Sequence, residues 1–157
     1  MALGEGPTVE VDEYVPVTLT WPGYFRMSDS PKSLMLDVGG CFVEIKVDRS
    51  SGELLEVIVV DAPRSGLLRS SDPLVIPGFE PGIPCLDVSE EEDWAADAAL
   101  DRIAPRLHSD GLDLTLRSQE AVRWIGGPRC RMGFSPEDEL VRLSISLEPP
   151  DTEVAFG

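Results

Sequence analysis

The stretch FVEIKVDRSSGELLEVIVV, residues 42–60, decides the fold. Apolar residues at 43, 45 and 47 alternate with charged residues at 44 and 46, the period of a half-buried β-strand. Asp48–Gly52 has the composition of a turn, because Asp and Ser bond the local backbone and Gly permits positive φ. Apolar residues return on both faces of 54–60, which is typical of a more central strand. The pattern predicts an antiparallel hairpin of 42–47 and 54–60.

The same period-two alternation extends outward from this hairpin in both directions. It begins at Val9 and favours strands at 15–21, 34–38, 112–117, 122–124, 130–134 and 141–147. Pro and Gly pairs punctuate these runs and indicate turns between them. We therefore expect a mainly β protein of the α+β class, formed as a single domain.

Two β-rich segments, about 9–61 and 112–148, resemble one another in order. Each has a strand, a second strand ending in a double glycine, a cysteine-bearing strand, a polar turn and a strand opening with Glu-Leu. The offset is 86 or 87 at the best-matched points. Duplication and the chance convergence of two common antiparallel meanders both explain this pattern. In either case we expect two similar meanders packed as a sandwich or a barrel-like body.

The segment between these halves changes character. Five prolines between 63 and 84 predict a long irregular connection over 62–87, because proline lacks a backbone donor. Ser89 followed by Glu92 has the spacing of a capping box, and alanines follow. A helix is predicted over about 90–104, ending before Pro105. The last seven residues are expected to be irregular.

The charge balance limits the classes of partner. The chain has 157 residues, with 13 Lys and Arg against 29 Asp and Glu, a net charge of −16. Phosphate backbones and anionic lipids would be repelled, so we expect neither nucleic acid nor membrane as a partner. No secretory signal is recognised at the N-terminus. Reduced cysteines without a disulfide framework favour the cytoplasm. Eleven of the basic residues are Arg and two are Lys, a usage associated with high-GC bacteria.

The sequence offers little for catalysis or for metal binding. Cys41, Cys85 and Cys130 have neither disulfide nor zinc spacing, so buried reduced thiols are expected. His108 is the single histidine, and its position before Gly111 favours a surface or capping role over a triad with Ser109 and Asp110. We expect no cofactor and no metal, and the sequence favours a binding protein over an enzyme.

Two clusters are candidate sites. The acidic run Glu90, Glu91, Glu92 and Asp93 with Trp94 either satisfies a helix N-terminus or contacts a partner. The aromatic residues Trp21, Tyr24 and Phe25 form either a corner of the core or the wall of a pocket.

The leading functional hypothesis is a non-catalytic acidic domain that contacts a basic protein, as an immunity or inhibitor protein does. The alternative is a small enzyme or a small-molecule-binding protein with a pocket between the two β halves. A homo-oligomer paired through edge strands is a third possibility.

Overall fold

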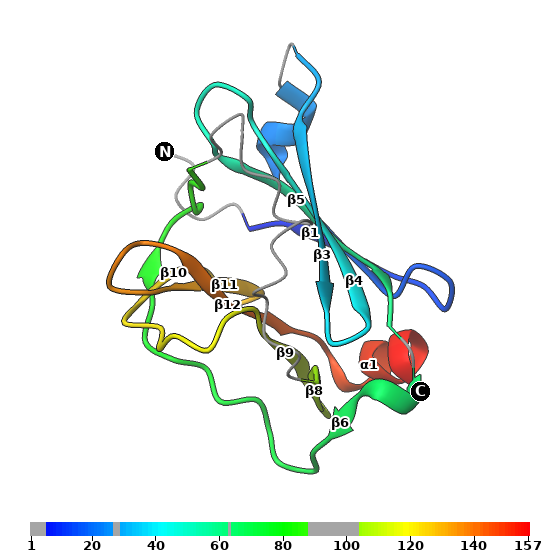
Figure 1. Cartoon of the computed structure of the whole chain (residues 1–157). Helices are drawn as coiled ribbons and strands as arrows, with labels where there is room; N and C mark the ends of the chain where they lie inside the picture. Colours follow the sequence, from blue (N-terminus) through cyan, green and yellow to red (C-terminus); the bar gives the residue numbers. More distant parts are fainter. Residues whose placement is uncertain (1–5, 27–28, 63, 88–103) are drawn as a thin grey trace.

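Two β-sheets are stacked face to face around one hydrophobic core in the computed structural model (Figure 1). The structure describes residues 6–26, 29–62, 64–87 and 104–157. The predicted class, mainly β with antiparallel sheets, is confirmed. The predicted helix over 90–104 lies almost wholly outside the described residues.

The first sheet comes from the N-terminal half and has the strand order β1-β2-β5-β4-β3. Its strands are β1 (Thr8–Val11), β2 (Val17–Thr20), β3 (Lys32–Val38), β4 (Cys41–Val47) and β5 (Leu54–Asp61). A short 3-10 helix, η1 (Pro22–Arg26), follows β2. The predicted hairpin is confirmed, since β4 and β5 pair antiparallel with Ile45 opposite Val57.

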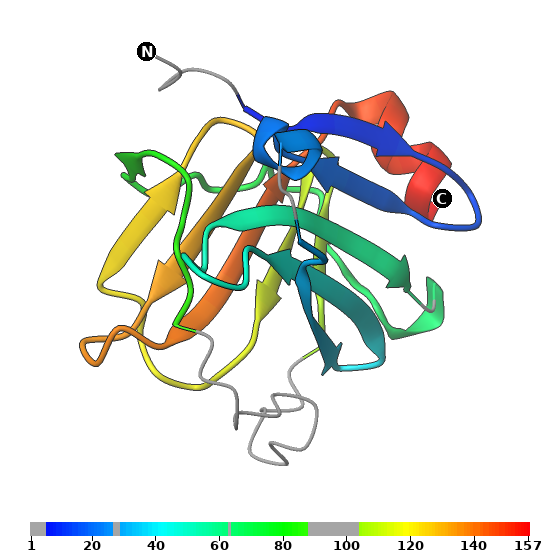
Figure 2. The same ribbon diagram turned by 90° about the horizontal axis from the view of Figure 1, so that it is seen from above.

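The second sheet has the strand order β6-β8-β9-β12-β11-β10-β7. Its C-terminal strands are β8 (Arg106–His108), β9 (Gly111–Thr115), β10 (Arg123–Gly126), β11 (Cys130–Phe134) and β12 (Leu140–Ser146). These five pair antiparallel with one another in the order β8-β9-β12-β11-β10. Figure 2 shows both sheets from above, with the strands of each running side by side.

The two halves share a strand order. The first sheet reads β1-β2-β5-β4-β3, and the second contains β8-β9-β12-β11-β10 at its centre. A register shift falls between Lys46 and Val47 in the first unit and between Gly133 and Phe134, 87 residues later, in the second. Both five-stranded units therefore pair their strands in the same order, and both have a register shift at the equivalent position. The two strand cysteines are not counterparts, because Val43, rather than Cys41, has the register position of Cys130.

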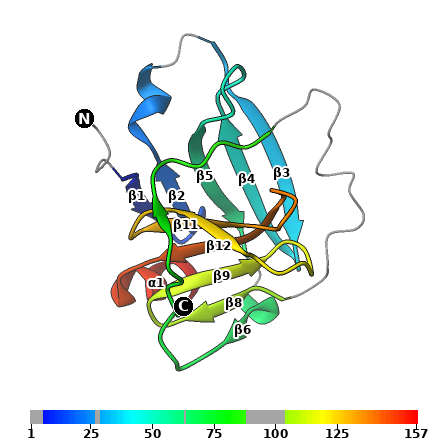
Figure 3. The same cartoon turned by 90° about the vertical axis from the view of Figure 1, so that its left-hand side faces the viewer.

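The segment between the halves adds two short strands to the second sheet. After η2 (Arg64–Gly66), β6 (Leu68–Arg69) pairs parallel with β8, and β7 (Glu80–Pro81) pairs parallel with β10. Between them the chain runs without regular structure past the second sheet, as predicted for 62–87 (Figure 3). The amide of Leu54 donates to the Pro84 carbonyl at 2.9 Å, which ties this segment to the first sheet.

Alternation explains how the core forms. In β4, side chains at 41, 43, 45 and 47 are buried, while those at 42, 44 and 46 are partly or largely exposed. The same holds in β9, where Leu112 and Leu114 are fully buried. These inward rows meet in one cluster that contains residues of both sheets. The space between the halves is therefore filled by apolar side chains.

One expectation from the sequence is wrong. Residues 149–156 form the helix α1 (Pro149–Phe156), whereas an irregular end was expected. Prolines at the first two helical positions suit a helix start, where their missing amide donors would be unpaired anyway. Phe156 is 1% exposed in the core, and its carbonyl accepts a hydrogen bond from Arg69 Nη2 at 2.6 Å. Tertiary packing therefore stabilises a helix that sequence pattern alone does not indicate.

Candidate functional site

The predicted aromatic cluster is divided by the structure. Trp21 is 4% exposed in the core, and its amide donates to the Leu55 carbonyl at 2.9 Å. Tyr24 and Phe25 lie on η1, their rings packed edge to face with centroids 5.7 Å apart. Phe25 is 76% exposed. Trp21 is thus a core residue, whereas Tyr24 and Phe25 belong to the surface.

The outer face of the first sheet carries apolar side chains between acidic ones. One row across the strands is Asp61, Phe42 and Asp37. The next row is Ile58, Glu44 and Met35. We call the face formed by these rows the apolar–acidic face. Exposed Phe and Met side chains therefore stand directly beside carboxylates.

A polar cluster lies at the η1 end of this face. Lys46 Nζ is 3.3 Å from Glu56 Oε1, and Thr20 Oγ1 donates to Glu56 Oε2 at 2.7 Å. The Lys46 ammonium also lies 5.6 Å from the centre of the Tyr24 ring. Burial lowers the pKa of Lys46, but the hydrogen bond and charge of Glu56 outweigh it, so this pKa is raised overall. Lys46 is consequently engaged chiefly by Glu56, and the charge of Glu44 contributes less to the raised pKa.

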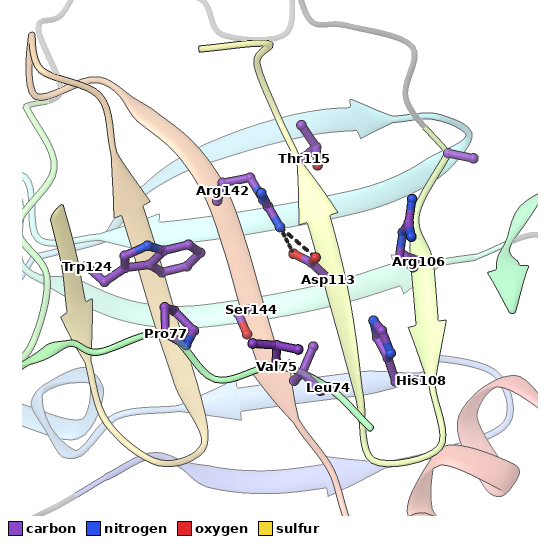
Figure 4. Close-up of a pocket in the computed structure, with 11 residues that line it drawn as sticks. Leu74, Val75, Pro77, Arg106, His108, Asp113, Thr115, Trp124, Arg142 and Ser144 are labelled. Carbon is purple, nitrogen blue, oxygen red and sulfur yellow. Dashed lines mark hydrogen bonds and ion pairs between the residues drawn. The ribbon is translucent and has the colours of Figure 1, made fainter. Parts of the chain in front are cut away.

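The outer face of the second sheet carries a groove of about 490 Å³ (Figure 4). Its floor comes from alternating residues of β8, β9, β12 and β10, and the irregular segment after β6 forms one wall. We call it the arginine groove; its lining residues are Leu74, Val75, Pro77, Ala104, Arg106, His108, Asp113, Thr115, Trp124, Arg142 and Ser144.

An ion pair occupies the centre of the groove. Arg142 Nη2 lies 2.7 Å from Asp113 Oδ1 and 2.6 Å from Asp113 Oδ2, so one nitrogen bonds both carboxylate oxygens. The guanidinium of Arg142 also lies over the Trp124 ring, 5.9 Å from its centre. Arg142 Nε is buried and has no hydrogen-bond partner. Both carboxylate oxygens of Asp113 therefore accept a hydrogen bond, whereas the Nε hydrogen of Arg142 is donated to no group.

The expected surface or capping role of His108 is wrong. This residue ends β8, is 9% exposed and lines the groove. Its Nδ1 lies 2.9 Å from the Asp72 carbonyl and must donate to it, since a carbonyl oxygen can only accept. The amide of Leu74 donates to Asp110 Oδ1 at 2.8 Å. These two bonds hold the wall segment against the β8–β9 hairpin.

A buried arginine lies beside the groove. Arg131 on β11 is 0% exposed. Its Nη1 donates to the carbonyls of Gly127 and Pro128, and its Nη2 donates to the hydroxyls of Ser144 and Ser146. Its Nε is buried without a partner. Burial lowers the pKa of Arg131, although an arginine stays charged under ordinary conditions.

The cysteines behave as packing residues in two of three cases. Cys41 and Cys130 are buried and unpaired, whereas Cys85 is exposed. Burial raises the pKa of both buried thiols to about 12, with Asp61 and Asp37 adding to the effect at Cys41. In the part of the chain that the structure describes, no group of three or more His, Cys, Asp or Glu residues is arranged to hold a metal ion. Among those residues, no helix has the length and apolar character needed to cross a membrane.

The other predicted site, Glu90, Glu91, Glu92, Asp93 and Trp94, lies outside the described residues. Sequence reasoning also missed the arginine groove. The signal it overlooked is the recurrence of Arg, His and Ser at outward positions of consecutive strands, a pattern normally assigned to a solvated face. No family model matches the chain, and no curated protein matches it.

Proposed function

We propose that the chain is a non-catalytic binding domain that docks a basic protein through the apolar–acidic face. The observation that carries this proposal is the exposure of Met35 and Phe42 by 40% and 43% on one sheet face. Large apolar side chains gathered on one surface and rimmed by charges are characteristic of protein-binding sites. Phe and Met are also enriched in the centres of such interfaces.

Charge defines the kind of partner. Asp37 and Asp61 flank Phe42 on neighbouring strands, and Glu44 lies opposite Met35. A partner that covers the apolar residues brings its own groups against these carboxylates, so its surface should carry Lys or Arg around an apolar centre. The net charge of −16 would speed association with such a surface and make it sensitive to salt.

Location and origin form part of the same proposal. Unpaired Cys41, Cys85 and Cys130 favour a reducing compartment, and we assign the domain to the cytoplasm. The shared strand order and the matching register shifts support duplication of one five-stranded unit. The arginine-rich composition supports a bacterial source.

Affinity capture with matched baits tests the docking face. The baits are the wild-type chain, the variant Met35→Ser/Phe42→Ser, the variant Glu44→Lys and the control Val154→Ser, whose side chain is 51% exposed on α1. A basic protein should be retained by the wild type and by the control, should be lost from both face variants, and should be released by raised salt. The captured protein is then purified and its affinity for each bait is measured by calorimetry.

Equal capture by the wild type and by Met35→Ser/Phe42→Ser would contradict the proposed face. Capture of the chain itself, confirmed by light scattering, would assign the face to a second copy in place of a basic partner.

A further inference from the structure

We propose that the arginine groove is a binding site for a small organic carboxylate with an apolar body. The groove lies on the outer face of the second sheet, on the opposite side of the sandwich from the apolar–acidic face. This inference therefore stands independently of the proposed docking function, and each can fail without the other.

The first observation is a local reversal of charge. In a chain of net charge −16, the described lining of the groove gathers two arginines, Arg106 and Arg142, around one carboxylate, Asp113, and His108 lines it as well. Within the described ranges, Arg106 is exposed and forms no ion pair. A small anion is the ligand that such a concentration of donors favours.

The second observation concerns donors that no protein group uses. Asp113 takes both its hydrogen bonds from Nη2 of Arg142, and Arg142 Nε is buried with no acceptor. His108 uses Nδ1 as a donor to the Asp72 carbonyl, so Nε2 of the neutral ring is an acceptor and does not count among these donors. Figure 4 shows Arg106, Arg142 and His108 arranged around Asp113. Unpaired donors of this kind are expected where a ligand supplies the missing acceptors.

The third observation is the charge beside the floor. Arg131 is fully buried and bonds only neutral acceptors, two carbonyls and two hydroxyls. A buried cation without a bonded carboxylate is costly; Asp113 supplies one nearby negative charge, and a second anion in the groove would reduce that cost further. Ser144 connects Arg131 to the groove: its Oγ accepts from Arg131 Nη2, which leaves its own hydroxyl proton to donate. Water can solvate Arg106 at the surface but does not reach Arg131.

The fourth observation selects the body of the ligand. Trp124 lies along one side of the groove, and Leu74, Val75 and Pro77 lie along the wall (Figure 4). Val75 is 82% exposed, so its apolar surface is open to a ligand in the groove. The volume of about 490 Å³ suits a small molecule. An aryl or branched alkyl carboxylate would place its anion among the donors and its apolar part between Trp124 and Val75.

A titration of the full chain with benzoate, followed by ¹H–¹⁵N NMR, tests the site. We expect saturable shifts of the Trp124 indole N–H and of the Thr115 and Ser144 amides. Arg106→Gln, which removes an exposed charge that forms no ion pair with any described residue, should weaken benzoate binding about tenfold. Arg129→Gln removes the same charge from the exposed turn before β11 and should leave binding unchanged.

Two further ligands separate charge from shape. Benzyl alcohol keeps the ring without the anion, and inorganic phosphate keeps the anion without the ring; each should bind at least about tenfold more weakly than benzoate. Phosphate binding as tight as benzoate would overturn the apolar body, and equal binding of benzyl alcohol would overturn the anion site. Non-saturating shifts, or equal effects of Arg106→Gln and Arg129→Gln in variants with native circular dichroism, would overturn the proposal altogether.

Discussion

Glu56 on β5 and Arg142 on β12 occupy the same position in the strand order shared by the two sheets, and they carry opposite charges. Each lies on an outer sheet face, next to the register shift of its unit. Each forms an ion pair within its own sheet, Glu56 with Lys46 and Arg142 with Asp113. In each cluster the cation also lies over an aromatic ring, Tyr24 of η1 beside the first sheet and Trp124 of β10 in the second.

Glu56→Gln should destabilise the first sheet. Glu56 is 9% exposed and holds both Lys46 and the Thr20 hydroxyl, and a neutral amide weakens both contacts. We expect a loss of about 1–2 kcal/mol in the free energy of unfolding. Urea unfolding checks this, with the exposed Glu120→Gln as the control. Equal midpoints for the two variants would show that the cluster does not stabilise the fold.

Gly52→Ala should be more damaging, because two effects coincide at the β4–β5 turn. Gly52 has φ +76°, and a Cβ there would clash with the Leu86 carbonyl. The left-handed backbone and the clash together should cost about 2–4 kcal/mol. Gly78→Ala, with nothing within 4 Å of the new Cβ, is the matched control and should change stability by less than about 0.5 kcal/mol. Thermal unfolding of both variants decides the prediction.

Arg131→Lys should destabilise the second sheet although it keeps the charge. A guanidinium reaches the two turn carbonyls with Nη1 and the two serine hydroxyls with Nη2, whereas an ammonium cannot span both pairs. We expect a loss of about 2 kcal/mol, measured by chemical denaturation. The exposed Arg129→Lys, two residues away, should be neutral, and a similar loss there would point to a general effect of the substitution.

Acid should weaken the β4–β5 turn only at very low pH. Hydrogen bonds from the Ser50 hydroxyl and from the Ser51 and Ser50 amides lower the pKa of Asp48 from 3.8 to about 2. A lowered folded-state pKa means that the stabilising effect is complete above the unfolded value and is lost as pH falls from about 4 through 2. Carboxyl NMR should give a midpoint near pH 2. Ser50→Ala should raise it, and a wild-type midpoint at 3.8 would contradict the observed hydrogen bonds.

The strands of this fold are predictable because their inward residues follow a strict period of two. The hairpin of 42–47 and 54–60 satisfies both the alternation and the turn chemistry at Asp48, so local and tertiary preferences agree. The end of the chain differs, since Pro149 and Pro150 suit an irregular segment as well as a helix start. Only the burial of Phe156 decides between these alternatives.

The arginine groove was not predictable for a related reason. Arg106, Asp113 and Arg142 occupy outward positions of three strands, and an outward charge is usually solvated. Alternation places Arg131 on the same outer face, yet its side chain is fully buried. The side chain is held by the Gly127 and Pro128 carbonyls of the preceding turn and by serine hydroxyls of β12, an arrangement that alternation does not reveal.

The parallel additions β6 and β7 have a consequence for polymerisation. The segment between the halves places β6 at one edge of the second sheet and β7 at the other. Each edge strand of that sheet is therefore only two residues long and is followed by irregular chain. These short edge strands offer few unpaired backbone N–H and C=O groups with which a strand of another molecule could pair. Within the described part of the chain, intermolecular strand exchange would therefore have to start at β1 or β3, and fibril growth from this protein would proceed through its N-terminal half.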